Sequence, residues 1–146
     1  HILAMYGPSF VTGRLMVRFG KERVAAVGLT LIAASAAVAL AGVDIAHFWL
    51  ALILLGIGWN FGFLGATAMV VACHTPSERS KVQGANDFLV FGTVATASFF
   101  SGSLLHSSGW EAINWLVLPT VALVLVPLVW RAARPSRIEI YERKSA

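Results

Sequence analysis

The polar side chain that lies deepest in an apolar stretch is Asn60, near the midpoint of residues 48–72. An amide buried in hydrocarbon without a partner costs roughly a few kcal/mol, so Asn60 is expected to face another helix or a cavity. Two roles fit this position: a structural hydrogen bond between helices, or a contact with a substrate. The ring of the neighbouring Trp59 likewise fits either a stacking platform for a substrate or a lipid-facing side chain.

Asp87 is a second candidate, about one turn into the apolar stretch 84–105. A carboxylate near the N-terminal end of a helix is stabilised by the helix dipole. It suits a capping and charge-pairing role with Arg79, Lys81 or a basic residue of an earlier loop, or a gate that pairs and releases as the protein changes conformation. Its position close to the membrane interface argues against a midplane proton carrier, and no other protonatable side chain lies deep in an apolar stretch.

Three glycines near Asn60 recur at helical spacing: Gly58, Gly62 and Gly65. Small residues at this spacing let a second helix approach closely, so we expect a packing face, with a flexible hinge as the alternative. The surrounding run, residues 56–65, has the wrong glycine spacing for a dinucleotide-binding motif and lacks the strand–helix–strand context that such a motif needs.

The reactive side chains predict no metal site, no cofactor and no catalytic centre. A single cysteine excludes an intrachain disulfide, and the histidines are scattered without the spacing of metal ligands. No Ser/His/Asp group or pair of carboxylates suggests an enzyme. The residues concerned are Cys73, His1, His47, His74 and His106.

The composition indicates a membrane as the solvent. Of 146 residues, 58% are hydrophobic and 12% are charged, and the mean hydropathy is +0.76. The chain enters apolar residues directly at His1. We therefore expect a piece of a longer integral membrane protein, with the lipid bilayer as its first partner.

The apolar residues fall into about five runs within residues 1–130, and a run of about 20 residues is long enough to cross a bilayer as a helix. Transmembrane strands would need short runs with polar and apolar residues alternating, which are not seen. The fold class expected is an all-α, polytopic transmembrane helical bundle. Its segments are about 1–17, 24–43, 48–72, 84–105 and 112–130.

The basic residues cluster in alternate connections, which predicts the orientation. All 11 Lys and Arg residues lie before the second segment, between the third and fourth, or after the fifth. The positive-inside rule then places these regions, including a basic tail at 131–146, in the cytoplasm. We expect a multi-pass protein of the bacterial inner (plasma) membrane with a cytoplasmic C-terminus. The net charge of +4 is explained by this pattern, so no nucleic-acid partner is expected.

Residues 13–23 resemble the short cytoplasmic loop of the major facilitator superfamily, in which glycine and a spaced leucine precede arginine, glycine and further basic residues. The matching positions are Gly13, Leu15, Arg18, Gly20 and Lys21, with Arg14 beside them, whereas Val17 replaces the aspartate that is usual in the N-terminal-half loop. Residues 77–94 are also similar to bacterial members of the family.

This resemblance implies the C-terminal half of such a transporter, from the end of helix eight to helix twelve. It implies that the first, third and fourth segments line the pathway, that the loop motif and Asp87 are gating candidates, and that two six-helix halves rock around a midplane site. The N-terminal half of the same protein and a small-molecule substrate are then the expected partners.

The same residues bear on three other classes of membrane protein. A four-helix multidrug exporter is expected to hold a glutamate within its first helix, whereas the glutamates here fall in loops, ends or the tail. A non-transporting membrane scaffold or assembly subunit is the main alternative, because packed glycine faces and few buried charges suffice for it. A membrane enzyme is the third.

Overall fold

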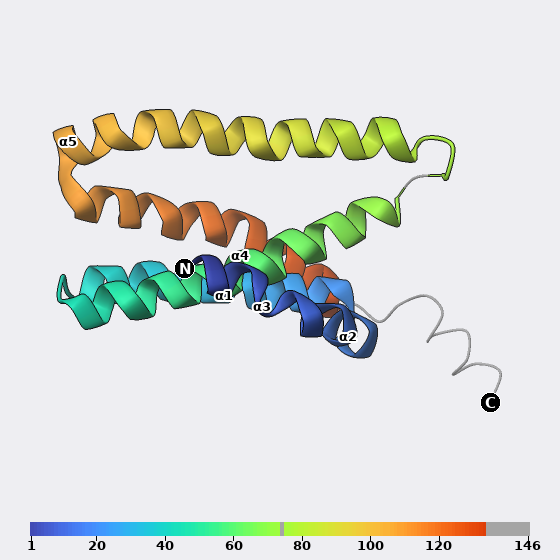
Figure 1. The fold of residues 1–146 in the computed structure, drawn as a ribbon, viewed down its shortest axis with the longest axis horizontal. Helices are drawn as coiled ribbons and strands as arrows, with labels where there is room; N and C mark the ends of the chain where they lie inside the picture. The colour runs from blue at the N-terminus through green and yellow to red at the C-terminus, as the bar shows by residue number, and fades with distance from the viewer. Residues whose placement is uncertain (74, 134–146) are drawn as a thin grey trace.

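The computed structural model describes residues 1–73 and 75–133, and every regular element in this part of the chain is a helix (Figure 1). The all-α prediction is therefore confirmed. The predicted tail 131–146 lies outside the described residues from position 134 onward. The helices are α1 (Ile2–Tyr6), α2 (Ser9–Phe19), α3 (Lys21–Ala41), α4 (Ile45–Val71) and α5 (Arg79–Ala133).

Three of these helices, α3, α4 and α5, are long and apolar enough to cross a membrane. The longest, α5, is two limbs that meet at Gly109, whose backbone is not helical (φ 77°, ψ 178°). Figure 1 shows these limbs, 79–108 and 110–133, running antiparallel. Only glycine adopts this backbone region readily, so one residue reverses the chain.

The first predicted segment, 1–17, is two helices rather than one. α1 ends at Tyr6, Gly7 and Pro8 form the break, and α2 begins at Ser9. Proline has no N–H to donate to the preceding turn, so a helix breaks at this position.

The predicted loop around residues 18–23 is shorter than the sequence suggests. α2 continues to Phe19 and α3 begins at Lys21, so Gly20 is the whole connection. Its backbone (φ 88°, ψ 146°) again lies where glycine is strongly favoured. The residues that resemble a loop therefore form a corner between two helices.

The most extensive contact in the bundle is between α3 and α4. A Cβ added at Gly65 would lie 2.8 Å from the Ala25 Cβ, so the two helices approach at backbone distance. The Ser35 hydroxyl donates to the Ala51 carbonyl across the same interface, at 2.9 Å. Small residues thus replace side-chain interdigitation along this pair.

The two limbs of α5 are packed very differently. The second limb joins α3, since the Trp110 Nε1 donates to the Ala39 carbonyl at 3.0 Å and the Arg131 Nε donates to Glu22 at 3.3 Å. The first limb lies at the edge of the molecule in Figure 1, and every residue from 91 to 103 is exposed.

Candidate substrate-pathway site

Asn60 lies in the middle of α4 and is 4% exposed. Its Nδ2 donates to the Met5 carbonyl at 2.6 Å and to the Ser9 hydroxyl at 2.7 Å. Its Oδ1 accepts from the Thr12 hydroxyl at 2.7 Å. Three groups of the first segment thus surround one amide.

The orientation of this amide follows from its partners. A backbone carbonyl only accepts, so the NH₂ group of Asn60 must face Met5 and the oxygen must face Thr12. The Thr12 hydroxyl also lies 2.8 Å from the Pro8 carbonyl, but it has a single hydrogen. Donation to Asn60 satisfies the otherwise buried amide oxygen, and Thr12 itself is fully buried.

These bonds span the break in the first segment. Met5 belongs to the end of α1, where the last carbonyls have no partner within the helix, and Ser9 is the first residue of α2. One turn earlier on α4, a Cβ at Gly56 would lie 2.8 Å from the Ala4 Cβ. α4 therefore packs closely on α1 and holds both sides of the break through Asn60.

The partners of this amide are protein groups, which favours the first of the two roles considered for Asn60, a structural hydrogen bond between helices. A contact of Asn60 with a substrate stays a prediction. Sequence reasoning missed Ser9 and Thr12, although two hydroxyls beside Pro8 in an apolar segment were the available signal.

Trp59 lies in a row of aromatic rings on a different face of α4. Its ring is stacked on that of Phe63, with centroids 6.0 Å apart and planes 6° apart. The Phe63 ring meets that of Phe91, on the first limb of α5, at 6.2 Å. We call Trp59, Phe63 and Phe91 the aromatic row. Trp59 and Phe63 are half-buried and Phe91 is exposed, so the row offers flat apolar surface to a planar ligand.

Asp87 is held by amides of its own helix. Its Oδ1 accepts from the Gln83 Nε2 at 3.1 Å and from the Asn86 Nδ2 at 3.2 Å. The structure shows these bonds in place of the predicted pairing with Arg79 or Lys81. A gating role for Asp87 stays a prediction.

The residues of the loop motif lie around the corner at Gly20. Gly13, Arg14 and Arg18 are exposed on α2, and the Arg18 guanidinium lies 5.3 Å from the centre of the Phe19 ring. Lys21 is half-buried at the start of α3. The ion pair between the next residue, Glu22, and Arg131 was not foreseen from the sequence, because the two lie at opposite ends of the chain.

The three predicted packing glycines are not equivalent. A Cβ at Gly58 would lie 2.8 Å from the Gly28 carbonyl oxygen, and Gly65 faces Ala25 in the same way. A Cβ at Gly62 would meet nothing within 4 Å. The Gly62 backbone does touch α3, because a Cβ on Gly28 would overlap its nitrogen. The Gly62 backbone therefore packs against Gly28 of α3, whereas a Cβ on Gly62 itself would extend into open space.

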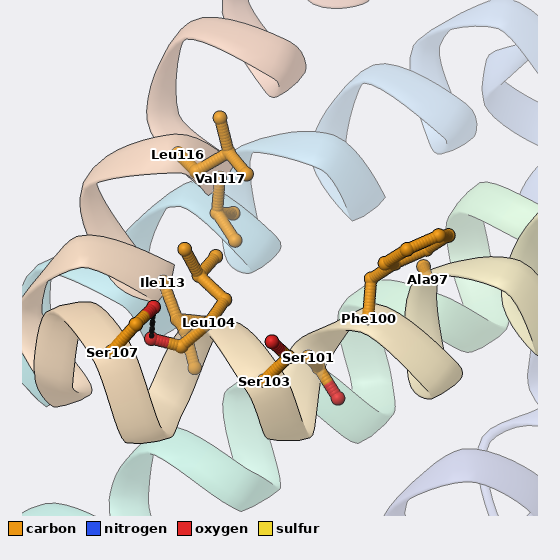
Figure 2. A pocket seen from close by; sticks show the side chains of 9 residues that line it. All are labelled: Ala97, Phe100, Ser101, Ser103, Leu104, Ser107, Ile113, Leu116 and Val117. Carbon is orange, nitrogen blue, oxygen red and sulfur yellow. Dashed lines mark hydrogen bonds between the residues drawn. The ribbon is translucent and has the colours of Figure 1, made fainter.

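A hollow of about 500 Å³ lies between the two limbs of α5, close to Gly109. Figure 2 shows Leu116 and Val117 of the second limb across from Leu104 and Phe100 of the first. None of its lining side chains is ionisable. The Ser107 hydroxyl on its rim donates to the Leu104 carbonyl of its own helix at 3.4 Å, so the hollow is mainly apolar. Within residues 1–73 and 75–133, no three His, Cys, Asp or Glu side chains are grouped to hold a metal ion.

The sequence of this chain is similar to a family model and to several known proteins. Residues 3–144 match the family model of the Major Facilitator Superfamily. The riboflavin transporter RfnT of Brucella anthropi is 72% identical over 131 residues, covering 90% of this chain and 33% of that protein. The MFS-type transporter YddS of Bacillus subtilis, which is uncharacterised, is 40% identical over 131 residues, covering 88% of this chain and 30% of that protein.

A more distant relative is the drug efflux pump JefA of Mycobacterium tuberculosis, 26% identical over 110 residues, covering 73% of this chain and 21% of that protein. The chain thus spans about a third or less of the length of these curated relatives. No solved structure matches it.

Proposed function

Because the chain belongs to the Major Facilitator Superfamily, we propose that it is part of a secondary transporter that moves riboflavin, or a close flavin analogue, by alternating access. The observation that carries the substrate is the 72% identity to the riboflavin transporter RfnT over 90% of this chain. The remaining helices of the pathway are supplied by the rest of the same protein, as the length of the relatives suggests.

The aromatic row supports a planar substrate. Flavins carry a flat, fused three-ring system, and such rings stack favourably on aromatic side chains at centroid distances of roughly 4.5–7 Å. Trp59 and Phe63 already lie with their planes nearly parallel, so they provide an ordered wall. We propose that this wall contacts the flavin ring while Asn60 fixes the helix beside it.

The orientation proposed for the bundle places the corner at Gly20 and the end of α5 in the cytoplasm, in a bacterial inner membrane. Its support is the distribution of Lys and Arg along the chain. Cysteines introduced at Lys21 and Lys81 should label from the cytoplasmic side, and cysteines at Ala46 and Ser108 from the opposite side. Cytoplasmic labelling at Ser108 would overturn this orientation.

Riboflavin counterflow in proteoliposomes tests the substrate, because exchange does not depend on the direction of net transport. The full-length transporter preloaded with unlabelled riboflavin should accumulate the labelled vitamin. Trp59→Ala should raise the KM for riboflavin about tenfold, as expected when roughly 1–1.5 kcal/mol of ring stacking is lost. Trp49→Ala is the matched control, since Trp49 lies on the same helix and is 66% exposed outside the aromatic row.

Absence of exchange by folded wild-type protein would rule out riboflavin as the substrate. Equal KM values for the two tryptophan variants would remove the aromatic row from the site while leaving the substrate intact.

A further inference from the structure

A second groove lies at the basic end of the bundle, away from the aromatic row. It has a volume of about 410 Å³ and is formed where the start of α3, the end of α4 and the last turns of α5 meet. Its floor is apolar and includes Met69, Val124 and Leu128. Its charged members are Lys21, Glu22 and Arg131.

The charges of this groove leave a surplus of positive charge. Lys21 and Arg131 are cationic and Glu22 is anionic, so two positive charges face one negative charge. The contact with Glu22 uses the Arg131 Nε, one of five N–H groups on a guanidinium. The Arg131 side chain is 73% exposed, whereas that of Glu22 is 32% exposed. The Arg131 guanidinium can therefore bind a second anion while it holds Glu22.

The combination of an apolar floor and a cationic rim selects the kind of ligand. A small soluble anion would use the rim alone, whereas a phospholipid places its phosphate on the cations and its acyl chain on the floor. The groove also lies where spans begin and end, at Lys21 and Arg131, which is the depth of lipid headgroups. Basic pockets between helix ends bind anionic headgroups in other membrane proteins.

We infer that this groove is a binding site for one anionic phospholipid, with its phosphate between Lys21 and Arg131 and an acyl chain along Met69, Val124 and Leu128. The lipid bridges helix ends that are far apart in the sequence. Glu22 orients Arg131 and limits the strength of phosphate binding by its own charge.

The test uses the full-length transporter in detergent, with phosphatidylglycerol as the probe and phosphatidylcholine as the neutral lipid. Phosphatidylglycerol should raise the thermal unfolding midpoint of the wild type more than phosphatidylcholine does. This difference should fall by at least half in a Lys21→Gln/Arg131→Gln variant. It should persist in an Arg79→Gln variant, which removes an exposed cation outside the groove.

Glu22→Gln separates lipid binding from the ion pair. If the phosphate binds Arg131, removal of the competing carboxylate should retain or enlarge the phosphatidylglycerol effect. A reduction equal to that of the Lys21/Arg131 variant would show that only the ion pair matters and would overturn the site. So would an equal stabilisation by inorganic phosphate, which has no acyl chain. These readouts do not depend on whether riboflavin is transported.

Discussion

On the face of α4 that meets α3, Gly58 and Gly65 bring two backbones into contact, whereas on the other face one amide, Asn60, holds two sides of a helix break. Gly58 and Asn60 are two residues apart, which places them roughly 200° apart around the helix. Lipid gives helices no hydrophobic reason to associate, so each face needs another source of attraction. The face that meets α3 depends on the absence of side chains at Gly58 and Gly65. The opposite face depends on the polar atoms of Asn60.

The contrast predicts opposite kinds of damage. Adding a carbon to the glycine face forces backbones apart, and backbones cannot rotate away. Removing a polar atom from the amide face leaves the helices in place but deprives buried groups of partners.

Gly28→Val in the full-length protein should have the largest effect on stability. A Cβ there would lie 2.7 Å from the Gly58 carbonyl oxygen and would overlap the Gly62 nitrogen. We expect a loss of about 3 kcal/mol, at the upper end of overpacking costs, with a low yield of folded protein. Thermal unfolding in detergent measures it.

Gly62→Ala is the control for this substitution, because the added Cβ would meet nothing within 4 Å. Its stability should change by less than about 1 kcal/mol, and a small gain is expected because alanine favours helix. Equal damage by both substitutions would mean that the space beside the Gly62 Cα is filled by a neighbouring helix, as its spacing in the sequence predicts.

Asn60→Leu should cost about 1–2 kcal/mol of stability, because the Met5 carbonyl and the Thr12 hydroxyl lose their buried partner. Riboflavin exchange per folded molecule should be preserved. Thermal unfolding and counterflow on the same preparation separate the two quantities. Lost exchange at wild-type stability would contradict the structural role and restore the substrate contact.

Thr12→Val should cost less, about 1 kcal/mol, because it removes one hydrogen bond of the network. In a double-mutant cycle with Asn60→Leu, the coupling energy should be about 0.5–1 kcal/mol. Thr30→Val is the matched control, since that hydroxyl donates to the Ala26 carbonyl of its own helix. A coupling as small as that of Thr30 would mean that the Thr12 hydroxyl does not serve the amide.

Among the substitutions that remove contacts, Phe63→Leu should have the smallest effect on stability, below about 1 kcal/mol, because only ring contacts are lost. Its effect on transport should be larger: the KM for riboflavin should rise several-fold. Phe99→Leu provides the comparison, because the Phe99 ring pairs with Phe100 outside the aromatic row. Equal KM values for Phe63→Leu and Phe99→Leu would mean that the aromatic row does not contact riboflavin.

The helical class was predictable because long apolar runs leave the backbone no partner except its own helix. The network around Asn60 was not, because its partners lie about fifty residues away in the chain and depend on where α1 breaks. The stacking of Trp59 on Phe63 follows from their four-residue spacing, but the contact with Phe91 required the packed structure. For Gly62, the helical spacing correctly predicted the side of α4 that meets α3. It did not show that a Cβ at this position would meet no neighbouring atom.

The two corners at Gly20 and Gly109 also constrain how the chain is built into a bilayer. A connection of one residue supplies roughly 3.5 Å of slack, far less than the length of a span. When the helix before such a corner spans the membrane, the next helix must begin at the same membrane surface. We therefore predict that the two limbs of α5 insert into the bilayer as one hairpin.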